Sequence, residues 1–200
     1  GLRGTGSHDI AVENLFVPAE RSVWFSTDPV RRGGALYAFP VFGLLALGIA
    51  AVSLGIARGA IDDILELAGA KVPTGSRRPL AERSSTQATV AQATALVAAS
   101  RAHLRATVDE IWQTAARGEQ ATLEQRARLR LAATQSVRDA AKAVDLAYEC
   151  GGATSIYADS ALQRRFRDVH VATQHILVAP ATYELAGRVL LGLPADTEML

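Results

Sequence analysis

Residues 148–175 combine side chains that transfer protons, bind anions and interrupt helices. They include the histidines His170 and His175, an arginine cluster at 164–167 and the glycine pair Gly151-Gly152. An imidazole exchanges protons near neutral pH, and arginine offers anions a planar fork of donors. Glycine lets the backbone approach a ligand closely. This combination is more typical of a functional site than of a scaffold.

The spacing of the two histidines argues against a metal site. His170 and His175 are five residues apart, whereas histidines that share a metal on one helix face stand four apart. The single cysteine, Cys150, excludes a thiolate zinc site and an intramolecular disulfide framework. We therefore expect no metal. We expect His170 to be structural, and we leave two roles open for His175, a catalytic group or a hydrogen-bonded core residue.

Simpler interpretations compete for the remaining groups. The cluster 164–167 is typical of a solvated surface, ion-paired with Asp159 and Asp168. Arg77 and Arg78 lie in a loop rich in glycine and proline, and anion binding is an equal alternative there. Gly151-Gly152 by itself predicts only the C-terminal cap of a helix. Cys150, which precedes that pair, is expected to be a small buried apolar side chain.

The first element that could position these groups is a long helix after residue 33. No charge occurs in 33–57, and helical spacing continues to Leu67. The length would suffice for a bilayer. However, Ala51, Gly55 and Gly59 recur at every fourth position, which favours close packing of another helix over a membrane span.

Two further long helices are expected after the loop at 71–79. Ser84 and Gln87 fit a capping box, followed by a seven-residue apolar repeat that ends at Gly118. A third helix follows after a short connection and ends at the glycine pair, and the two should be antiparallel neighbours. A last helical region covers about 160–193, and Pro180 should kink or split it. Four helices with short connections predict a mainly α protein, an up-and-down four-helix bundle.

The N-terminal residues follow a different pattern. Short apolar runs at 8–12 and 15–17 predict short β-strands within 1–27, which would need partner strands to bury a core. Asp28-Pro29 and Gly33-Gly34 predict a boundary.

Composition narrows the class of protein. Two hundred residues with 49% hydrophobic and 20% charged residues suit one sizeable domain, or one domain and part of another. A net charge of +1 and few aromatic residues give no support for nucleic-acid binding. No charged segment precedes an apolar run at the start, so we expect no signal peptide. The single cysteine fits a reducing compartment, so we expect a cytoplasmic location. The opening GLRGTGSHD suggests a fragment.

Several motifs, taken in order, resemble the acyl-CoA dehydrogenase superfamily. Residues 1–9, GLRGTGSHD, and 16–18, FVP, are similar to the end of its middle β domain. The glycine pair, the run RRFRD at 164–168 and the residues up to His175 are similar to its last helical stretch. The resemblance implies a C-terminal helical bundle over 31–200, preceded by the remnant of a β domain over 1–30. It also implies a flavin cofactor, FMN or FAD, and a homo-oligomer, a dimer or tetramer.

The resemblance also implies which residues bind the cofactor. Arg77 or Arg78 falls where these dehydrogenases place an arginine on the flavin diphosphate across a subunit boundary. Gln87 falls near a glutamine of the same region. Gly151 and Gly152 match a glycine pair whose backbone approaches the cofactor of a neighbouring subunit.

One departure from the dehydrogenase pattern bears on the reaction. Common acyl-CoA dehydrogenases place a catalytic glutamate after the RRFRD region, but Ile176 stands there, and no acid occurs between Asp168 and Glu184. Removal of the α-proton of a thioester needs such a base. The variant pattern resembles the flavin-dependent monooxygenases of this fold, which receive reduced flavin from a separate reductase. In them a histidine at the position of His175 lies beside flavin and substrate, where an imidazole can stabilise a peroxide or deprotonate a phenol.

The resemblance therefore implies an enzyme, a reduced-flavin-dependent monooxygenase that hydroxylates an aromatic or polycyclic small molecule. His175 is its expected catalytic residue, and this chain alone is expected to be inactive. An acyl-CoA dehydrogenase with its base elsewhere and a non-catalytic oligomerisation module remain alternatives. We expect a flavin reductase as a partner. We expect binding neither to nucleic acid nor to a membrane.

Overall fold

The computed structural model describes residues 2, 4–6, 8–24, 28 and 32–200. In that part of the chain the regular elements are α-helices and short 3-10 turns. The helices are α1 (Ala35–Ala38), α2 (Val41–Ala70), α3 (Ser84–Ala116), α4 (Leu123–Gly151), α5 (Ala161–Ala172) and α6 (Ala181–Leu190). The turns are η1 (Ala19–Arg21), η2 (Leu80–Glu82), η3 (Gly152–Ile156) and η4 (Ile176–Val178).

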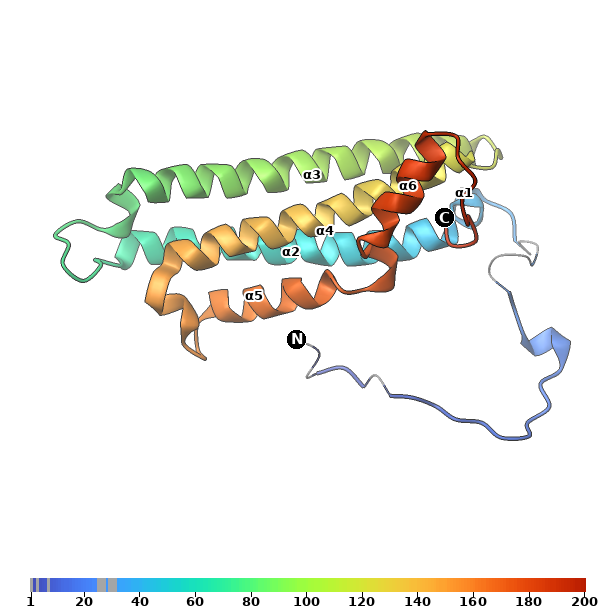
Figure 1. The fold of residues 1–200 in the computed structure, drawn as a ribbon, viewed down its shortest axis with the longest axis horizontal. Helices are drawn as coiled ribbons and strands as arrows, with labels where there is room; N and C mark the ends of the chain where they lie inside the picture. The colour runs from blue at the N-terminus through green and yellow to red at the C-terminus, as the bar shows by residue number, and fades with distance from the viewer. Residues whose placement is uncertain (1, 3, 7, 25–27, 29–31) are drawn as a thin grey trace.

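The helices α2, α3, α4 and α5 form an up-and-down four-helix bundle, as the sequence predicts. They alternate in direction along the long axis of the molecule, with α3 on one side of α4 and α5 on the other (Figure 1). The shorter α6 packs on α4. The expected last helical region is split by η4 and Pro180 into α5 and α6.

Helix α4 is the centre of this bundle because it contacts α2, α3, α5 and α6. Half of its buried positions are alanine, which allows the neighbouring helices to approach closely. Leu129 is a fully buried large side chain, and its neighbour Arg130 is a buried charged one. A charged residue at the centre of a helical core needs hydrogen-bond partners.

Helix α2 lies within the bundle, although by length and composition alone it could cross a membrane. Of the described helices it is the one that meets this criterion. Its buried face, which includes Ala50, packs against α3, α4 and α5. The small residues Ala51 and Gly55 do not pack on another helix of this chain, since both are exposed. Gly59 alone meets a neighbour, the guanidinium of Arg165. The expected small-residue contact within the chain is therefore wrong for most of its length.

A capping box begins α4. The Thr122 hydroxyl accepts from the Gln125 backbone N–H at 3.1 Å, and the Gln125 side chain accepts from the Thr122 N–H at 2.9 Å. The capping box expected at Ser84 is wrong, because Arg83 precedes α3 without a side-chain cap. The Gln87 amide instead donates to the Ala81 carbonyl at 3.1 Å, since η2 runs directly into α3.

Replacing Thr122 with alanine should therefore lower the free energy of unfolding by about 1 kcal/mol, the usual loss for a capping hydroxyl. Ser84→Ala is the matched control and should stay within about 0.5 kcal/mol of the unsubstituted protein. Urea unfolding followed by circular dichroism measures both. A larger loss at Ser84 would contradict this assignment of the caps.

The N-terminal residues do not form the expected strands in the described part of the chain. Residues 8–18 are irregular, followed by η1, and Ile10 and Phe16 are 88% and 85% exposed. A strand needs a neighbour for its backbone hydrogen bonds, and no strand is present among the described residues to pair with. Three residues of the predicted N-terminal motif, Gly1, Arg3 and Ser7, lie outside the described residues. The predicted domain boundary at 30–31 lies outside them as well. The division into two domains stays a prediction.

Candidate functional site

The glycine pair forms the C-terminal end of α4, and its two members differ in environment. Gly151 is buried with helical dihedral angles, and its carbonyl accepts from the Lys71 Nζ at 2.7 Å. A Cβ at Gly151 would lie 2.2 Å from the Ser155 Oγ. Gly152 is exposed, with φ 58° and ψ −143°, a conformation that strongly favours glycine. The pair is thus the predicted helix cap, and only Gly152 presents its backbone to the outside.

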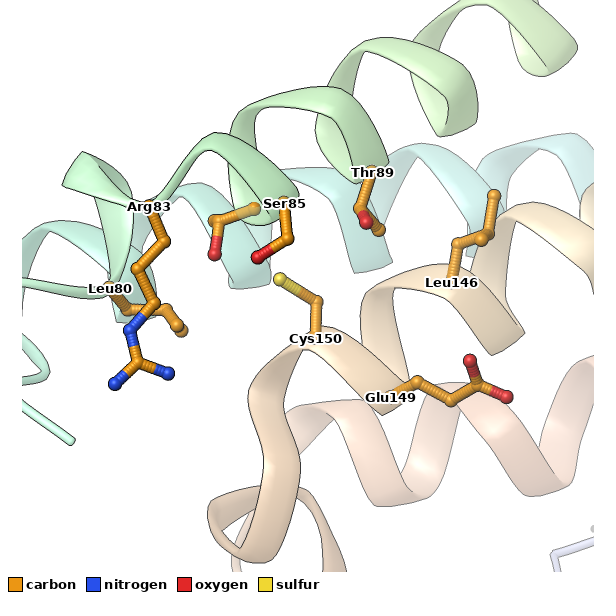
Figure 2. A pocket seen from close by; sticks show the side chains of 8 residues that line it. Leu80, Arg83, Ser85, Thr89, Leu146, Glu149 and Cys150 are labelled. Atoms are coloured by element: carbon orange, nitrogen blue, oxygen red, sulfur yellow. The ribbon is translucent and has the colours of Figure 1, made fainter. Parts of the chain in front are cut away.

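A hollow of about 280 Å³ lies between this end of α4 and the start of α3 (Figure 2). Figure 2 shows Arg83 and Ser85 on its α3 side and Cys150 on its α4 side. The hollow is lined by Leu80, Arg83, Ser85, Thr86, Thr89, Leu146, Glu149 and Cys150. The start of α3 has no side-chain cap, so its first N–H groups remain available beside these hydroxyls and the guanidinium. Such a donor set suits an anion such as a phosphate group.

The expected flavin-binding arginines lie at this same end of the bundle. Arg77 and Arg78 are exposed on the loop between α2 and η2 (Figure 1). The Ser76 hydroxyl donates to the Arg78 carbonyl at 3.0 Å, and the Leu80 N–H donates to the Lys71 carbonyl at 2.8 Å. Neither guanidinium forms an ion pair within the described residues, so both can meet an anion. The structure therefore brings all four candidate cofactor residues to one end of the bundle.

His175 lies elsewhere, at the start of η4. Its ring is exposed, and its Nδ1 accepts from the Leu177 backbone N–H at 3.2 Å. A nitrogen that accepts a hydrogen bond carries no proton, so the neutral ring has its proton on Nε2. Nothing among the described residues hydrogen-bonds to Nε2. The length of α5, about 18 Å for its 12 residues, separates His175 from Gly152, so the candidate residues form two places and not one.

His170 has the structural role expected for it. Its Nε2 lies 2.8 Å from the Asp145 Oδ1, which ties α5 to α4. Its ring also packs on Phe166 with 4.5 Å between centroids, and Phe166 packs on Tyr148 at 4.6 Å. These contacts fix the orientation of α5 on α4.

Within the described residues, Arg165 of the arginine cluster forms an ion pair that joins two helices of the bundle. Arg165 donates through Nε to the Asp63 Oδ2 at 3.1 Å, which ties α5 to α2. Asp63 is distant from Arg165 in the sequence, so the sequence pattern, in which Asp168 follows the cluster, did not predict this ion pair. The described residues contain no group of three or more His, Cys, Asp or Glu side chains arranged to hold a metal.

The family described as acyl-CoA dehydrogenase, C-terminal domain, matches residues 47–180. The chain belongs to this family. The match runs from α2 through η4 and so includes both Gly152 and His175.

Relatives of this acyl-CoA dehydrogenase C-terminal domain include oxygenases. Indole-3-acetate monooxygenase of Acinetobacter baumannii is 32% identical over 96% of this chain and 49% of its own length. The flavin-dependent monooxygenase, oxygenase subunit HsaA, of Rhodococcus jostii is 29% identical over 100% of this chain and 55% of its own. The crystal structure of 3-HSA hydroxylase from Rhodococcus sp. RHA1 has a TM-score of 0.89 at 28% identity, covering 100% of this chain and 54% of that one. The chain spans about half the length of the curated relatives it matches.

Proposed function

We propose that the protein containing this chain is the oxygenase component of a reduced-flavin-dependent monooxygenase that hydroxylates an aromatic or polycyclic substrate. The similarity of the whole chain to an indole-3-acetate monooxygenase and to a flavin-dependent oxygenase subunit carries the proposal. The position of Ile176, which is 69% exposed where a dehydrogenase of the common type has its glutamate, supports it as well.

The residues at the α4 end of the bundle fit a flavin phosphate. Arg77 and Arg78 supply unpaired guanidinium groups, and Gly152 supplies an exposed backbone that no Cβ shields. Gly151 positions that backbone from within, because its carbonyl is held by Lys71. A bound flavin, FMN or FAD, would supply the redox chemistry. Because these residues are far from His175, we propose that they bind the flavin of a neighbouring subunit in a dimer or tetramer.

His175 is the proposed catalytic residue, and its hydrogen bond distinguishes between two roles. A base that removes a phenol proton through Nε2 needs that nitrogen unprotonated, which places the proton on Nδ1. The Leu177 N–H points at Nδ1 and opposes that tautomer. The arrangement therefore favours Nε2–H as a donor that stabilises negative charge on an oxygen near the substrate.

Two partners follow from the same proposal. An oxygenase component needs a flavin reductase, and the relative named an oxygenase subunit supports that partner. The exposed face of α2, with Leu45, Ala51, Val52 and Gly55, supports a further copy of the chain as an oligomer partner. A cytoplasmic location, where reduced flavin is available, belongs to the proposal.

An acyl-CoA dehydrogenase is the second candidate, and the family match favours it. One pair of assays on the full-length protein separates the two. We expect oxygen-dependent hydroxylation of phenolic or indolic substrates when reduced flavin is supplied, with ¹⁸O from O₂ in the product. Dye-coupled oxidation of an acyl-CoA without oxygen would contradict the proposal. Absence of both reactions and of flavin binding would instead favour an oligomerisation module.

A further inference from the structure

Arg130 is a buried arginine whose guanidinium binds backbone carbonyls. Only 3% of the residue is exposed, and burial lowers the pKa of its guanidinium from the usual value. Its Nε and Nη2 donate to the Leu177 carbonyl at 3.2 and 2.9 Å, and its Nη1 donates to the Met199 carbonyl. No carboxylate in the described part of the chain pairs with it. The guanidinium thus holds backbone from η4 and from the C-terminal residues against α4.

The carbonyl that Arg130 binds belongs to the residue that also binds His175. The Leu177 N–H donates to the His175 Nδ1 at 3.2 Å, while its carbonyl accepts from Arg130. The turn is fixed further by the Val178 N–H, which donates to the His175 carbonyl at 2.9 Å, and by burial of both apolar side chains. Leu177 therefore links the guanidinium to the imidazole.

We propose that Arg130 is a positioning residue that fixes the ring orientation and tautomer of His175 through the backbone of Leu177. The inference rests on the proposed function, in which the His175 Nε2–H acts on the substrate. A purely apolar side chain at 130 would fill this space without the cost of a buried charge. It would leave the Leu177 carbonyl without its donor, and the turn that holds the Leu177 N–H against His175 would lose one of its contacts.

Arg130→Lys and Arg130→Met in the full-length protein test this role. Lysine retains the charge but lacks the planar fork that makes two bonds to one carbonyl. We expect hydroxylation to fall on the order of 10-fold in Arg130→Lys and toward 100-fold in Arg130→Met, the scale of a misplaced catalytic group. Arg138→Met is the matched control: Arg138 lies on the same helix, and its hydrogen bond within the described residues goes to the Thr173 carbonyl at 3.4 Å. The hydroxylation rate of Arg138→Met should stay within about 3-fold of the unsubstituted protein. The bond that this variant loses involves neither Leu177 nor the His175 ring.

A second measurement does not depend on activity. In protein with ¹⁵N-labelled histidine, the His175 signals, assigned by their loss in His175→Gln, should report an unprotonated Nδ1 before substitution. They should move toward a mixture of tautomers in Arg130→Lys. Unchanged signals in that variant would overturn the proposal, as would activity losses that only follow the folded fraction. If His175→Ala proves fully active, the proposed catalytic role fails, while these signals still decide whether Arg130 sets the tautomer.

Discussion

Replacing His175 with alanine is expected to lower the hydroxylation rate by about 100-fold or more, the usual scale for loss of a positioned proton donor or acceptor. The effect should be on turnover more than on folding, because the ring is exposed and its hydrogen bond among the described residues is with the Leu177 N–H. Single-turnover kinetics with reduced flavin already bound would measure the chemical step alone. Circular dichroism should show an unchanged helix content.

His170→Ala is the control for this substitution. It also removes an imidazole near the end of the same region, but one engaged with Asp145 and Phe166 in packing α5 on α4. We expect it to lower the melting temperature while the rate per folded molecule stays within a few-fold. A His175→Ala variant with the rate of the unsubstituted protein would remove His175 from the site. A large rate loss at His170 alone would reverse the two assignments.

The long helices could be predicted from the sequence because their periodic apolar residues and their breakers agree. The predicted ends at Gly118 and Gly151 lie within two residues of the ends of α3 and α4. The capping box predicted at Ser84 was wrong because the sequence pattern shows only that the residue types of a cap are present. The backbone entering from η2 decides whether it is used. Thr122 with Gln125 has the same type of pattern and does form the cap.

The site was less predictable because it depends on contacts distant in sequence. Gly152 and His175 are close along the chain, so they suggested one site, but a straight helix places them at different positions along the bundle. Arg130 carried no local signal, since a single arginine in an amphipathic helix is typical of the exposed face. Its burial arises because η4 and the C-terminal residues close over it. Such a role becomes visible only from the tertiary structure.

Gly151→Ala is expected to lower the free energy of unfolding by about 1–3 kcal/mol, the range for overpacking a filled site. Helix propensity alone predicts the opposite, a gain of up to about 1 kcal/mol, because Gly151 has helical dihedral angles. Packing decides the sign. The new Cβ would lie 2.2 Å from the Ser155 Oγ and 2.9 Å from the Leu162 Cδ1, and both side chains are buried. Denaturant unfolding at constant m-value measures the change.

Two further variants separate a steric effect from a general intolerance of change. The Ser155 hydroxyl donates to the Tyr148 carbonyl at 2.7 Å, so turning it away from a new Cβ breaks a hydrogen bond. In a Ser155→Ala background Gly151→Ala should cost about 1 kcal/mol less, a coupling typical of residues in contact. Gly59→Ala should be near neutral, because the gain in helix propensity offsets a shift of the Arg165 guanidinium, whose atoms lie 2.6–2.9 Å from the new Cβ and which pairs with Asp63. If Gly151→Ala loses the same stability in the unsubstituted protein and in the Ser155→Ala background, contact with Ser155 is not the cause. A loss of flavin binding without any loss of stability would place the need for Gly151 at the cofactor and not in the packing beneath it.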